Sequence, residues 1–168
     1  MDNPPGLPPP TTDLNAMGVL TRREIEARLL APMLEAFCAE FERERVLAIA
    51  RQVIVQVARE QGAQLAVMAG GCLLAHFSSS LEDWKKDGAL VIDVLEEKEN
   101  TFSFDVTRCR YAEMYNALGI LELGEILSCN RDYALIEGFN PDVELQRTQT
   151  IMDGAPFCDF RYQIKTDG

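Results

Sequence analysis

The first half of the chain repeats apolar and polar residues with the period of an α-helix. An apolar side chain recurs at every fourth position, at Ile25, Leu29, Met33, Phe37 and Phe41. This spacing predicts a helix whose single apolar stripe is buried. Thr21 and Glu24 have the spacing of a capping box, which predicts the start of that helix. Pro32 predicts a kink or a restart within it.

The same period continues through residues 42–61 and predicts a second helix. Its expected buried face consists of Val46, Ile49, Ala50, Val53 and Val57, and Gly62 follows as an expected left-handed cap. Residues 64–77 are apolar and nearly uncharged, which predicts a buried helix broken at the Gly-Gly pair in its middle. Ser79 and Glu82 repeat the capping-box spacing, which predicts a short helix over residues 81–87.

The period changes to two in the middle of the chain, which predicts strands. Residues 89–96 are rich in Val, Ile and Leu, and residues 101–107 alternate, with Phe102, Phe104 and Val106 on one face. The acidic segment between them predicts a turn. The pattern then predicts helices over 110–118 and 122–137, a strand over 143–152, a turn over 153–156 and a strand over 157–164.

This order of elements predicts an α+β fold, because no parallel βαβ rhythm appears. We expect one domain over residues 19–168, with N-terminal helices packed on a small antiparallel sheet. Residues 1–18 differ, because five prolines fall within the first ten positions. We expect an extended, unstructured leader there rather than a segment that docks a partner.

Composition and charge exclude several classes of function. The net charge is −11 and the 16 Lys and Arg are scattered among 27 acids, so we expect no nucleic-acid partner. Neither a secretory signal nor an apolar run of about 18 residues occurs, so we expect no membrane association and a cytoplasmic protein. The five cysteines are widely spaced without a CxxC motif, which predicts reduced thiols. The apolar N-terminal helices could form a homo-oligomer interface as easily as a core.

The chain has a single histidine, His76, and this count excludes several catalytic mechanisms. A zinc site with two or three His ligands is impossible within one chain. His76 lies in an apolar run without a neighbouring carboxylate to orient it, so we expect a core or interface residue rather than a catalytic base. We expect no cofactor and no resident metal, although a site made of Cys109, Cys129, Cys158 and a carboxylate stays open.

Candidate chemistry gathers in the C-terminal third, over residues 105–162. Cys129 and Asp132 are three positions apart on one predicted helix, so they share a face. Asn130 and Arg131 complete a polar cluster between apolar neighbours. The cluster favours the wall of a site, and the alternative is a capped helix start.

Two further cysteines fall at the ends of predicted elements. If Thr107 caps the next helix, Cys109 lies at the positive end of the helix dipole, which stabilises a thiolate. The alternative is a small buried apolar residue, as most free cysteines are. In the last predicted strand, Cys158 shares a face with Phe160 and Tyr162.

Arg147 and Gln149 share a face of the predicted strand 143–152 with apolar residues. A buried arginine needs an anionic partner. The candidate partners are Asp132, Asp159, Glu113 or a substrate carboxylate. Asp159 and Arg161 lie on the other face of the last strand, where they could form a simple ion pair.

Five short strings follow one another in this third: TRCRYAE at 107–113, LSCNRD at 127–132, EGFNP at 137–141, RTQT at 147–150 and GAPFCDFRY at 154–162. No single string is specific. Together and in this order they resemble the L-2-amino-thiazoline-4-carboxylic acid hydrolase family. The string RREIE at 22–26 fits the same family.

The resemblance implies a hydrolase that acts on carbon–nitrogen bonds of a cyclic amidine. Its substrate would be a five-membered cyclic isothiourea with a carboxylate, on the route from aminothiazoline carboxylate towards cysteine. Cys129 or Cys158 would be the nucleophile, Asp132 the general base or amidinium holder, and Arg147 the anchor of the substrate carboxylate. Further substrate-binding candidates are Asn130, Glu113, Asp159 and Gln149, with Cys109 in a secondary role.

The alternative function is a non-catalytic small-molecule-binding or sensor domain that retains the pocket. Some members of the family carry a histidine just before the last cysteine, where this chain has Phe157. His76 is the only histidine that could replace it. A carboxylated ligand that raises the melting temperature without forming product would favour this alternative.

Overall fold

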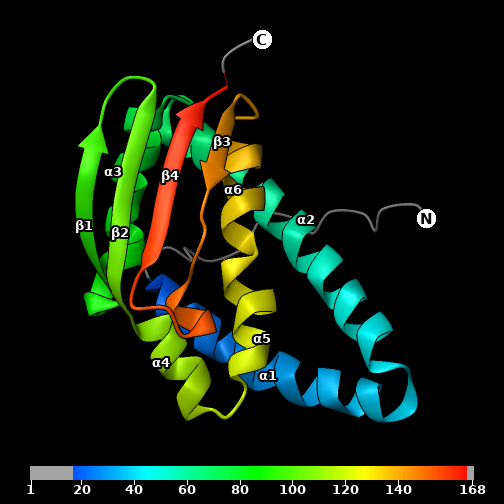
Figure 1. Cartoon of the computed structure of the whole chain (residues 1–168). Coiled ribbons are helices and arrows are strands. Elements are labelled where there is room, and N and C mark those ends of the chain that lie inside the picture. Colours follow the sequence, from blue (N-terminus) through cyan, green and yellow to red (C-terminus); the bar gives the residue numbers. More distant parts are fainter. Residues whose placement is uncertain (1–16, 166–168) are drawn as a thin grey trace.

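A computed structural model describes residues 17–165, so most of the leader predicted at residues 1–18 lies outside the described residues (Figure 1). Helices come first: α1 (Val19–Glu40), α2 (Arg43–Ala69), α3 (Leu74–Lys85) and the 3₁₀ turn η2 (Lys86–Gly88). They precede strands β1 (Leu90–Glu97) and β2 (Thr101–Cys109) and the helical segments α4 (Arg110–Ala117), α5 (Leu121–Gly124), η3 (Glu125–Cys129) and α6 (Arg131–Phe139). The last elements are β3 (Val143–Gln146), the 3₁₀ turn η4 (Ile151–Asp153) and β4 (Cys158–Ile164).

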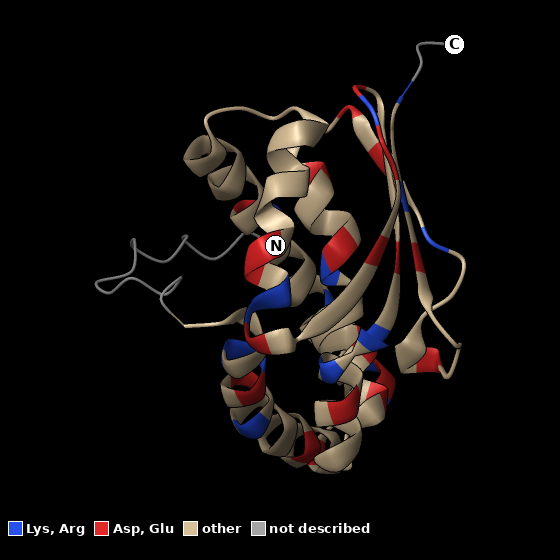
Figure 2. Ribbon diagram, turned by 90° about the vertical axis from the view of Figure 1, so that its left-hand side faces the viewer, with Lys and Arg blue, Asp and Glu red and all other residues tan. Residues whose placement is uncertain are grey.

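The strands form one antiparallel sheet in the order β1-β2-β4-β3. Helices cover one face of this sheet and leave the other open (Figure 2). In the register of β2 and β4, Phe102 lies opposite Tyr162 and Phe104 lies opposite Phe160. These four side chains are buried, and the rings of Phe104 and Phe160 stack with centroids 4.8 Å apart. The alternation read from the sequence is therefore that of a sheet with one covered face, and the α+β prediction is confirmed.

The start of α1 differs from the prediction. The helix begins at Val19 after Gly18, and no side chain caps it, so the capping box predicted at Thr21 and Glu24 is wrong. Pro32 lies inside α1 without dividing it into two helices.

The buried stripe predicted for α1 is also wrong. The five side chains of that stripe are exposed at fractions from 43% to 63%, and α1 instead buries Ala27, Ala31 and Leu34. Of the face predicted for α2, Val46 is buried as expected, but Ile49, Val53 and Val57 are exposed, and the helix instead buries Ile54 and Ala58. Small side chains let these helices approach their neighbours closely. The periodicity of the larger apolar residues does not predict which small residues form these contacts.

Two glycines hold α2 against α6. Gly62 lies inside α2, so the cap predicted there is wrong, and the left-handed cap is Gly70 with φ 73°. A Cβ atom at Gly62 would come within 2.0 Å of the Leu135 carbonyl oxygen of α6. A Cβ atom at Gly138 would come within 1.9 Å of the Arg59 carbonyl oxygen of α2. Only glycine permits this approach, which fixes α6 between α2 and the sheet (Figure 1).

The helix after the glycine break begins earlier than predicted. α3 starts at Leu74, so Ser79 is not its cap; its hydroxyl donates to the His76 carbonyl oxygen instead. Among the described helices, none alone is long and apolar enough to cross a membrane. By length and composition the pair Arg43–Ala69 and Leu74–Gly88, bent by 108°, passes that test together.

The helix predicted over residues 122–137 is interrupted by η3, a π-helical turn. The amide of Asn130 donates to the Glu125 carbonyl oxygen at 2.9 Å, a bond that spans five residues. Such a turn inserts one residue into a helix and changes its phase, and such turns are frequent at functional sites. Here it precedes Arg131 and Asp132 at the start of α6.

The strand predicted over residues 143–152 is shorter than expected. β3 ends at Gln146, because the amides of Thr148 and Gln149 donate to the Asp159 carboxylate instead of a neighbouring strand. The chain then turns inward through η4.

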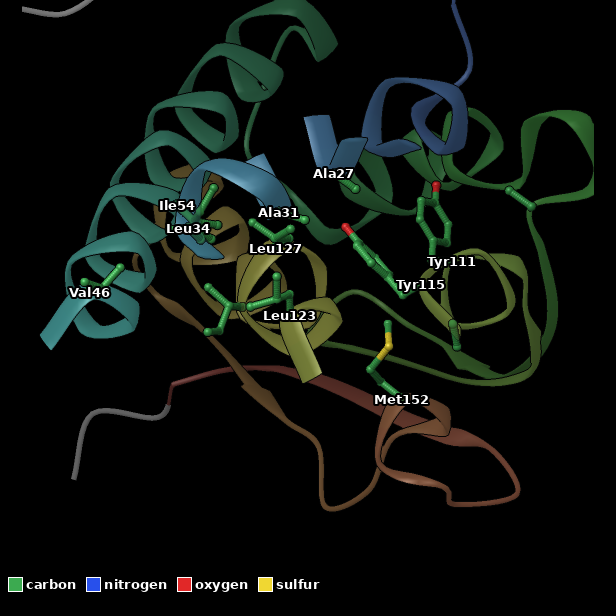
Figure 3. Packing of buried hydrophobic residues seen from close by; sticks show 13 residues of the cluster. Ala27, Ala31, Leu34, Val46, Ile54, Tyr111, Tyr115, Leu123, Leu127 and Met152 are labelled. Atoms are coloured by element: carbon green, nitrogen blue, oxygen red, sulfur yellow. The ribbon is translucent and has the colours of Figure 1, made fainter. Parts of the chain in front are cut away.

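The interior consists of two apolar clusters. One joins α1, α2, α4 and η3 around Tyr115, Leu127 and Met152 (Figure 3). The other joins α3 and α6 to the covered face of the sheet around Phe77, Phe104 and Tyr162. Leu90 and Cys109 pack against both clusters, so the clusters meet at the ends of β1 and β2.

Candidate functional site

A cavity of about 120 Å³ lies where the two clusters meet. Its apolar lining consists of Val19, Trp84, Leu90, Val106, Tyr111, Leu135, Met152 and Phe160. Its polar lining consists of Arg23, Cys109, Ser128, Cys129, Arg131, Asp132, Arg147 and Cys158. An apolar enclosure with a few converging polar groups is typical of a small-molecule site.

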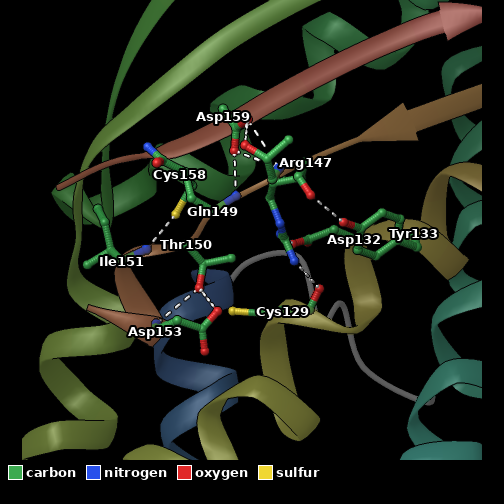
Figure 4. A network of polar contacts seen from close by, with 11 residues as sticks. Cys129, Asp132, Tyr133, Arg147, Gln149, Thr150, Ile151, Asp153, Cys158 and Asp159 are labelled. Atoms are coloured by element: carbon green, nitrogen blue, oxygen red, sulfur yellow. Dashed lines mark hydrogen bonds and ion pairs between the residues drawn. The ribbon is translucent and has the colours of Figure 1, made fainter. Parts of the chain in front are cut away.

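Three of the five cysteines converge on this cavity. Cys109 ends β2, Cys129 ends η3 and Cys158 begins β4. The Sγ atom of Cys158 accepts a hydrogen bond from the Ile151 amide at 3.1 Å (Figure 4). The three thiols are separated by tens of residues in the sequence, so only the fold brings them together.

The surroundings of Cys109 favour a neutral thiol. β2 continues to Cys109, so Thr107 lies in the strand and is not the helix cap. Burial raises the pKa of Cys109 to about 11, and the amides of Ala112 and Tyr111 oppose this only in part. The alternative of a small, buried, largely apolar residue therefore describes Cys109 better than a stabilised thiolate.

The other two thiols are also neutral at physiological pH. Burial raises the pKa of Cys129, and the nearby Asp132 carboxylate raises it further, while Arg147 lowers it. Burial raises the pKa of Cys158, against the effect of the Ile151 amide. A nucleophilic role for either cysteine requires a base that removes its proton when the ligand is present.

Asp132 and Arg147 form an ion pair inside the cavity. Arg147 Nη1 donates to Asp132 Oδ2 at 2.5 Å, and the two side chains are 5% and 23% exposed respectively. Of the partners expected for Arg147, Asp132 is the one that the structure provides. Burial raises the pKa of the Asp132 carboxyl and Arg147 opposes that rise, so the carboxylate is more basic than usual.

Arg147 is engaged on every side (Figure 4). Its Nη2 donates to the Cys129 carbonyl oxygen at 3.1 Å. Its guanidinium carbon lies 5.1 Å from the ring centroids of both Tyr133 and Phe160. Burial lowers the pKa of Arg147, but Asp132 outweighs this effect and raises the pKa. These contacts fix the guanidinium in one position.

Arg131 and Arg23 also line the cavity. Arg131 is 5% exposed, and its Nη2 donates to the Gln61 side-chain oxygen at 2.7 Å. Arg23 comes from α1 and pairs with Glu26 one turn later, at 2.6 Å. Arg131 belongs to the polar cluster visible in the sequence. Arg23 belongs to the string RREIE that fits the family, but its place in the site was not predicted, because it lies more than 100 residues away from Cys129 in the sequence.

Three other predicted site residues do not line the cavity. Asn130 lies beside it in sequence, and its Nδ2 is enclosed without a partner among the described residues. Glu113 is exposed and accepts two hydrogen bonds from Arg108, at 2.7 and 3.1 Å. Gln149 Nε2 donates to the Phe157 carbonyl oxygen at 3.1 Å.

Asp159 also lies outside the lining and supports it from behind. Its carboxylate accepts from the Thr148 amide at 3.0 Å, the Thr148 hydroxyl at 2.7 Å and the Gln149 amide at 2.9 Å (Figure 4). These bonds lower the pKa of Asp159 although burial opposes them. The ion pair suggested between Asp159 and Arg161 is wrong, because Arg161 pairs with Asp105 at 2.8 Å. Asp159 instead holds the segment that follows Arg147.

His76 does not line the cavity. Its Nδ1 is enclosed without a hydrogen-bond partner in residues 17–165, and its ring lies against Gly71. Over the same residues, no three His, Cys, Asp or Glu side chains are grouped as metal ligands. The three-cysteine metal site that the sequence left open is therefore not supported by the geometry.

The arrangement combines groups that suit a small polar molecule. Arg147 binds only Oδ2 of Asp132. Oδ1 of Asp132 has no hydrogen-bond partner within the described chain, and it is not among the enclosed polar atoms. Oδ1 can therefore accept from a cationic ligand beside the Cys129 and Cys158 thiols. Three guanidinium groups in the same lining provide donors for an anion.

Comparisons with known proteins agree with the sequence resemblance. No curated protein matches the sequence significantly. A similar solved structure is a trafficking protein particle complex subunit 3 from Naegleria fowleri covalently bound to palmitic acid, with 12% sequence identity and a TM-score of 0.52. The match covers 87% of this chain and 96% of that chain, and at this identity it shows the fold alone. The family model of L-2-amino-thiazoline-4-carboxylic acid hydrolase matches residues 22–162, so the chain belongs to this family.

Proposed function

We propose that the protein opens a small cyclic amidine or isothiourea that carries a carboxylate, of the L-2-amino-thiazoline-4-carboxylate type. The observation that carries the proposal is the single cavity in which Cys129, Cys158, Asp132 and Arg147 meet. Family membership supplies the substrate class. The small volume favours a ligand well below the roughly 300–1,000 Å³ of pockets for drug-sized molecules.

The cationic part of the substrate binds to Asp132. The ring carbon of an isothiourea is bonded to two nitrogens and one sulfur, and it becomes electrophilic when the amidine is protonated. The free Oδ1 of Asp132 accepts from this amidinium, while Arg147 keeps the carboxylate in place through Oδ2. Asp132 thus selects the protonated, reactive form of the ring.

Cys129 then acts as the nucleophile and Asp132 as the base. The basic Asp132 carboxylate takes the proton of the Cys129 thiol, and Sγ bonds to the amidine carbon. The ring carbon–nitrogen bond breaks, and the departing nitrogen takes the proton from Asp132. Water then adds to the same carbon, the Cys129 bond breaks and the thiol recovers its proton. The overall reaction consumes one water and leaves a carbamoyl group on the substrate sulfur.

Product analysis by NMR tests the reaction with purified protein and L-2-amino-thiazoline-4-carboxylate. We expect slow ring opening without a free thiol in the product. A free thiol would show that the ring carbon–sulfur bond breaks instead of the carbon–nitrogen bond. Arg28→Met is the matched control, because Arg28 is an exposed arginine of α1 outside the cavity.

Substitutions assign the roles. Asp132→Asn is expected to lower kcat at least a hundredfold, because the general base is lost. Cys129→Ala is expected to abolish a covalent intermediate detectable by mass spectrometry. Activity that survives Cys129→Ala but not Asp132→Asn would assign the attack to water. Full activity in Cys129→Ala, Cys158→Ala and Asp132→Asn would exclude this mechanism.

A binding or sensor module is the second candidate function. The raised pKa of all three cavity thiols and the position of His76 outside the cavity favour it. In this case the thiazoline carboxylate raises the melting temperature and no product forms during prolonged incubation. If neither binding nor product is detected, both candidate functions fail.

A further inference from the structure

The cavity contains three arginines, but carboxylates of the described chain pair with only two of them. Arg147 pairs with Asp132, and Arg23 pairs with Glu26. Arg131 forms no ion pair with any residue in the range 17–165. These five groups therefore carry a net charge of +1, located around Arg131.

Arg131 is an unusual residue to leave without a carboxylate. It is as buried as the core leucines, at 5% exposure, and its one hydrogen-bond partner is the neutral Gln61 side chain. A buried charge without a counter-charge costs several kcal/mol in general. Burial and the neighbouring Arg23 lower the pKa of Arg131 to about 10, and the Glu26 and Asp132 carboxylates oppose this only in part, so the group stays charged at neutral pH.

The guanidinium of Arg131 still has donors to offer. Only Nη2 is used, and neither Nε nor Nη1 has a partner among the described residues. Neither of these nitrogens is among the enclosed polar atoms, and Arg131 lines the cavity. Nε and Nη1 can therefore each donate a hydrogen bond to an anion in the cavity, at two different edges of the guanidinium.

Arg147 is the opposite case. Its charge is neutralised by Asp132, its Nη2 is bound to the Cys129 carbonyl oxygen, and its guanidinium carbon lies over the rings of Tyr133 and Phe160. A second carboxylate at Arg147 would lie next to the Asp132 carboxylate and repel it. Arg147 is better suited to positioning Asp132 than to holding an anion.

We propose that Arg131, with Arg23 beside it, binds the carboxylate of the cavity ligand, and that Arg147 positions Asp132. The proposal rests on the proposed function for the identity of the ligand. Arg131 and Asp132 both line the cavity from the start of α6, so the cavity offers a cation and an anion to one ligand. The ligand class is a small zwitterion whose carboxylate and amidinium are separated by a few bonds.

Binding of two rings tests the proposal. We compare L-2-amino-thiazoline-4-carboxylate with 2-amino-2-thiazoline, which lacks only the carboxylate, by calorimetry on the full chain. We expect the wild type to bind the carboxylated ring at least tenfold more tightly. Arg131→Met should lose most of this preference and keep its affinity for the ring without a carboxylate. Arg28→Met, the exposed control on α1, should retain the preference.

The melting temperature of the ligand-free protein separates a binding role from a structural one. Arg131→Met should melt at or above the wild-type temperature, because it removes a poorly compensated buried charge. If Arg131→Met fails to fold, Arg131→Gln replaces it in the binding comparison. A preference for the carboxylated ring that survives in the folded variant overturns the proposal. An equal loss of affinity for both rings shows a structural role for Arg131 and also overturns the proposal.

A ring that has no amidine to open distinguishes failure of the proposed hydrolysis from failure of the proposed anion site. Thiazolidine-4-carboxylate has the carboxylate but no amidine carbon. If the wild type binds this compound through Arg131 but turns over no thiazoline, the proposed hydrolysis fails and the anion site stands. If thiazoline is hydrolysed and Arg131→Met keeps the carboxylate preference, the hydrolysis stands and the anion site fails.

Discussion

The cavity lining contains two arginines with buried side chains and opposite surroundings. Arg147 has a carboxylate, a carbonyl oxygen and two aromatic rings around it. Arg131 has one neutral amide. A buried charge with an internal partner contributes to the structure, and a buried charge without one is stabilised only when a ligand supplies the partner. The difference therefore separates a positioning residue from a binding residue in the same lining.

The largest expected effect on stability comes from removing the carboxylate that pairs with Arg147. Asp132→Asn leaves Arg147 buried without a counter-charge, so the free energy of unfolding should fall by about 3 kcal/mol. Urea denaturation followed by circular dichroism measures it. The double variant Asp132→Asn/Arg147→Met should regain most of the loss. A loss below about 1 kcal/mol for Asp132→Asn would show that the pair contributes no more than a surface ion pair.

A second effect concerns the buried, neutral thiol of Cys109 in the same cavity. Cys109 remains protonated until about pH 11 in the folded chain, whereas the unfolded thiol ionises near its ordinary pKa of 9.0. Between these values the folded state binds the extra proton, so stability falls as pH rises, by up to about 2 kcal/mol. Below pH 9 both states are protonated and the contribution is constant. Denaturation of wild type and Cys109→Ala from pH 8 to pH 11 measures it, and parallel curves would contradict the raised pKa.

A third effect concerns Arg131, the cavity arginine that forms no ion pair with a described residue. Arg131→Met should change the free energy of unfolding by no more than about 1 kcal/mol, and in the stabilising direction. The same denaturation experiment with and without thiazoline carboxylate shows whether stabilisation by the ligand is lost. Destabilisation as large as that of Asp132→Asn would remove the contrast between the two arginines.

The smallest effect concerns α1, which brings Arg23 to the cavity. Leu29 is 63% exposed, so Leu29→Ala should cost less than about 0.5 kcal/mol. Leu34→Ala is the matched control at a buried position and should cost about 2–3 kcal/mol. A loss for Leu29→Ala that grows with protein concentration would show that a second copy of the chain covers this face.

The sheet could be predicted from the sequence because its alternation is strict. Phe102, Phe104 and Val106 are buried on one face, as their period of two indicates. The packing of α1 and α2 could not be predicted, since Ala27 and Ala58 are buried while larger side chains on the same helices are exposed. A hydrophobicity pattern weights large residues, whereas close helix contacts select small ones.

The candidate site was predicted in part. Cys129 and Asp132 were expected on one face, and their helix does place both at the cavity. The periodicity does not indicate the π turn η3, which contains Cys129, and the string RREIE does not indicate that Arg23 reaches the cavity, because that depends on contacts between distant segments. Glu113 and Gln149 were candidates by residue type, but each has a partner outside the lining.

A crystal structure of Cys129→Ser soaked with L-2-amino-thiazoline-4-carboxylate tests the central claim most directly. Serine keeps the shape of residue 129 and removes the thiol, so the ring should remain intact. We predict a ring in the cavity with its carboxylate within hydrogen-bond distance of Arg131 and its amidine at Oδ1 of Asp132. A ring bound elsewhere on the protein, or a carboxylate on Arg147 with Asp132 displaced, would contradict the account.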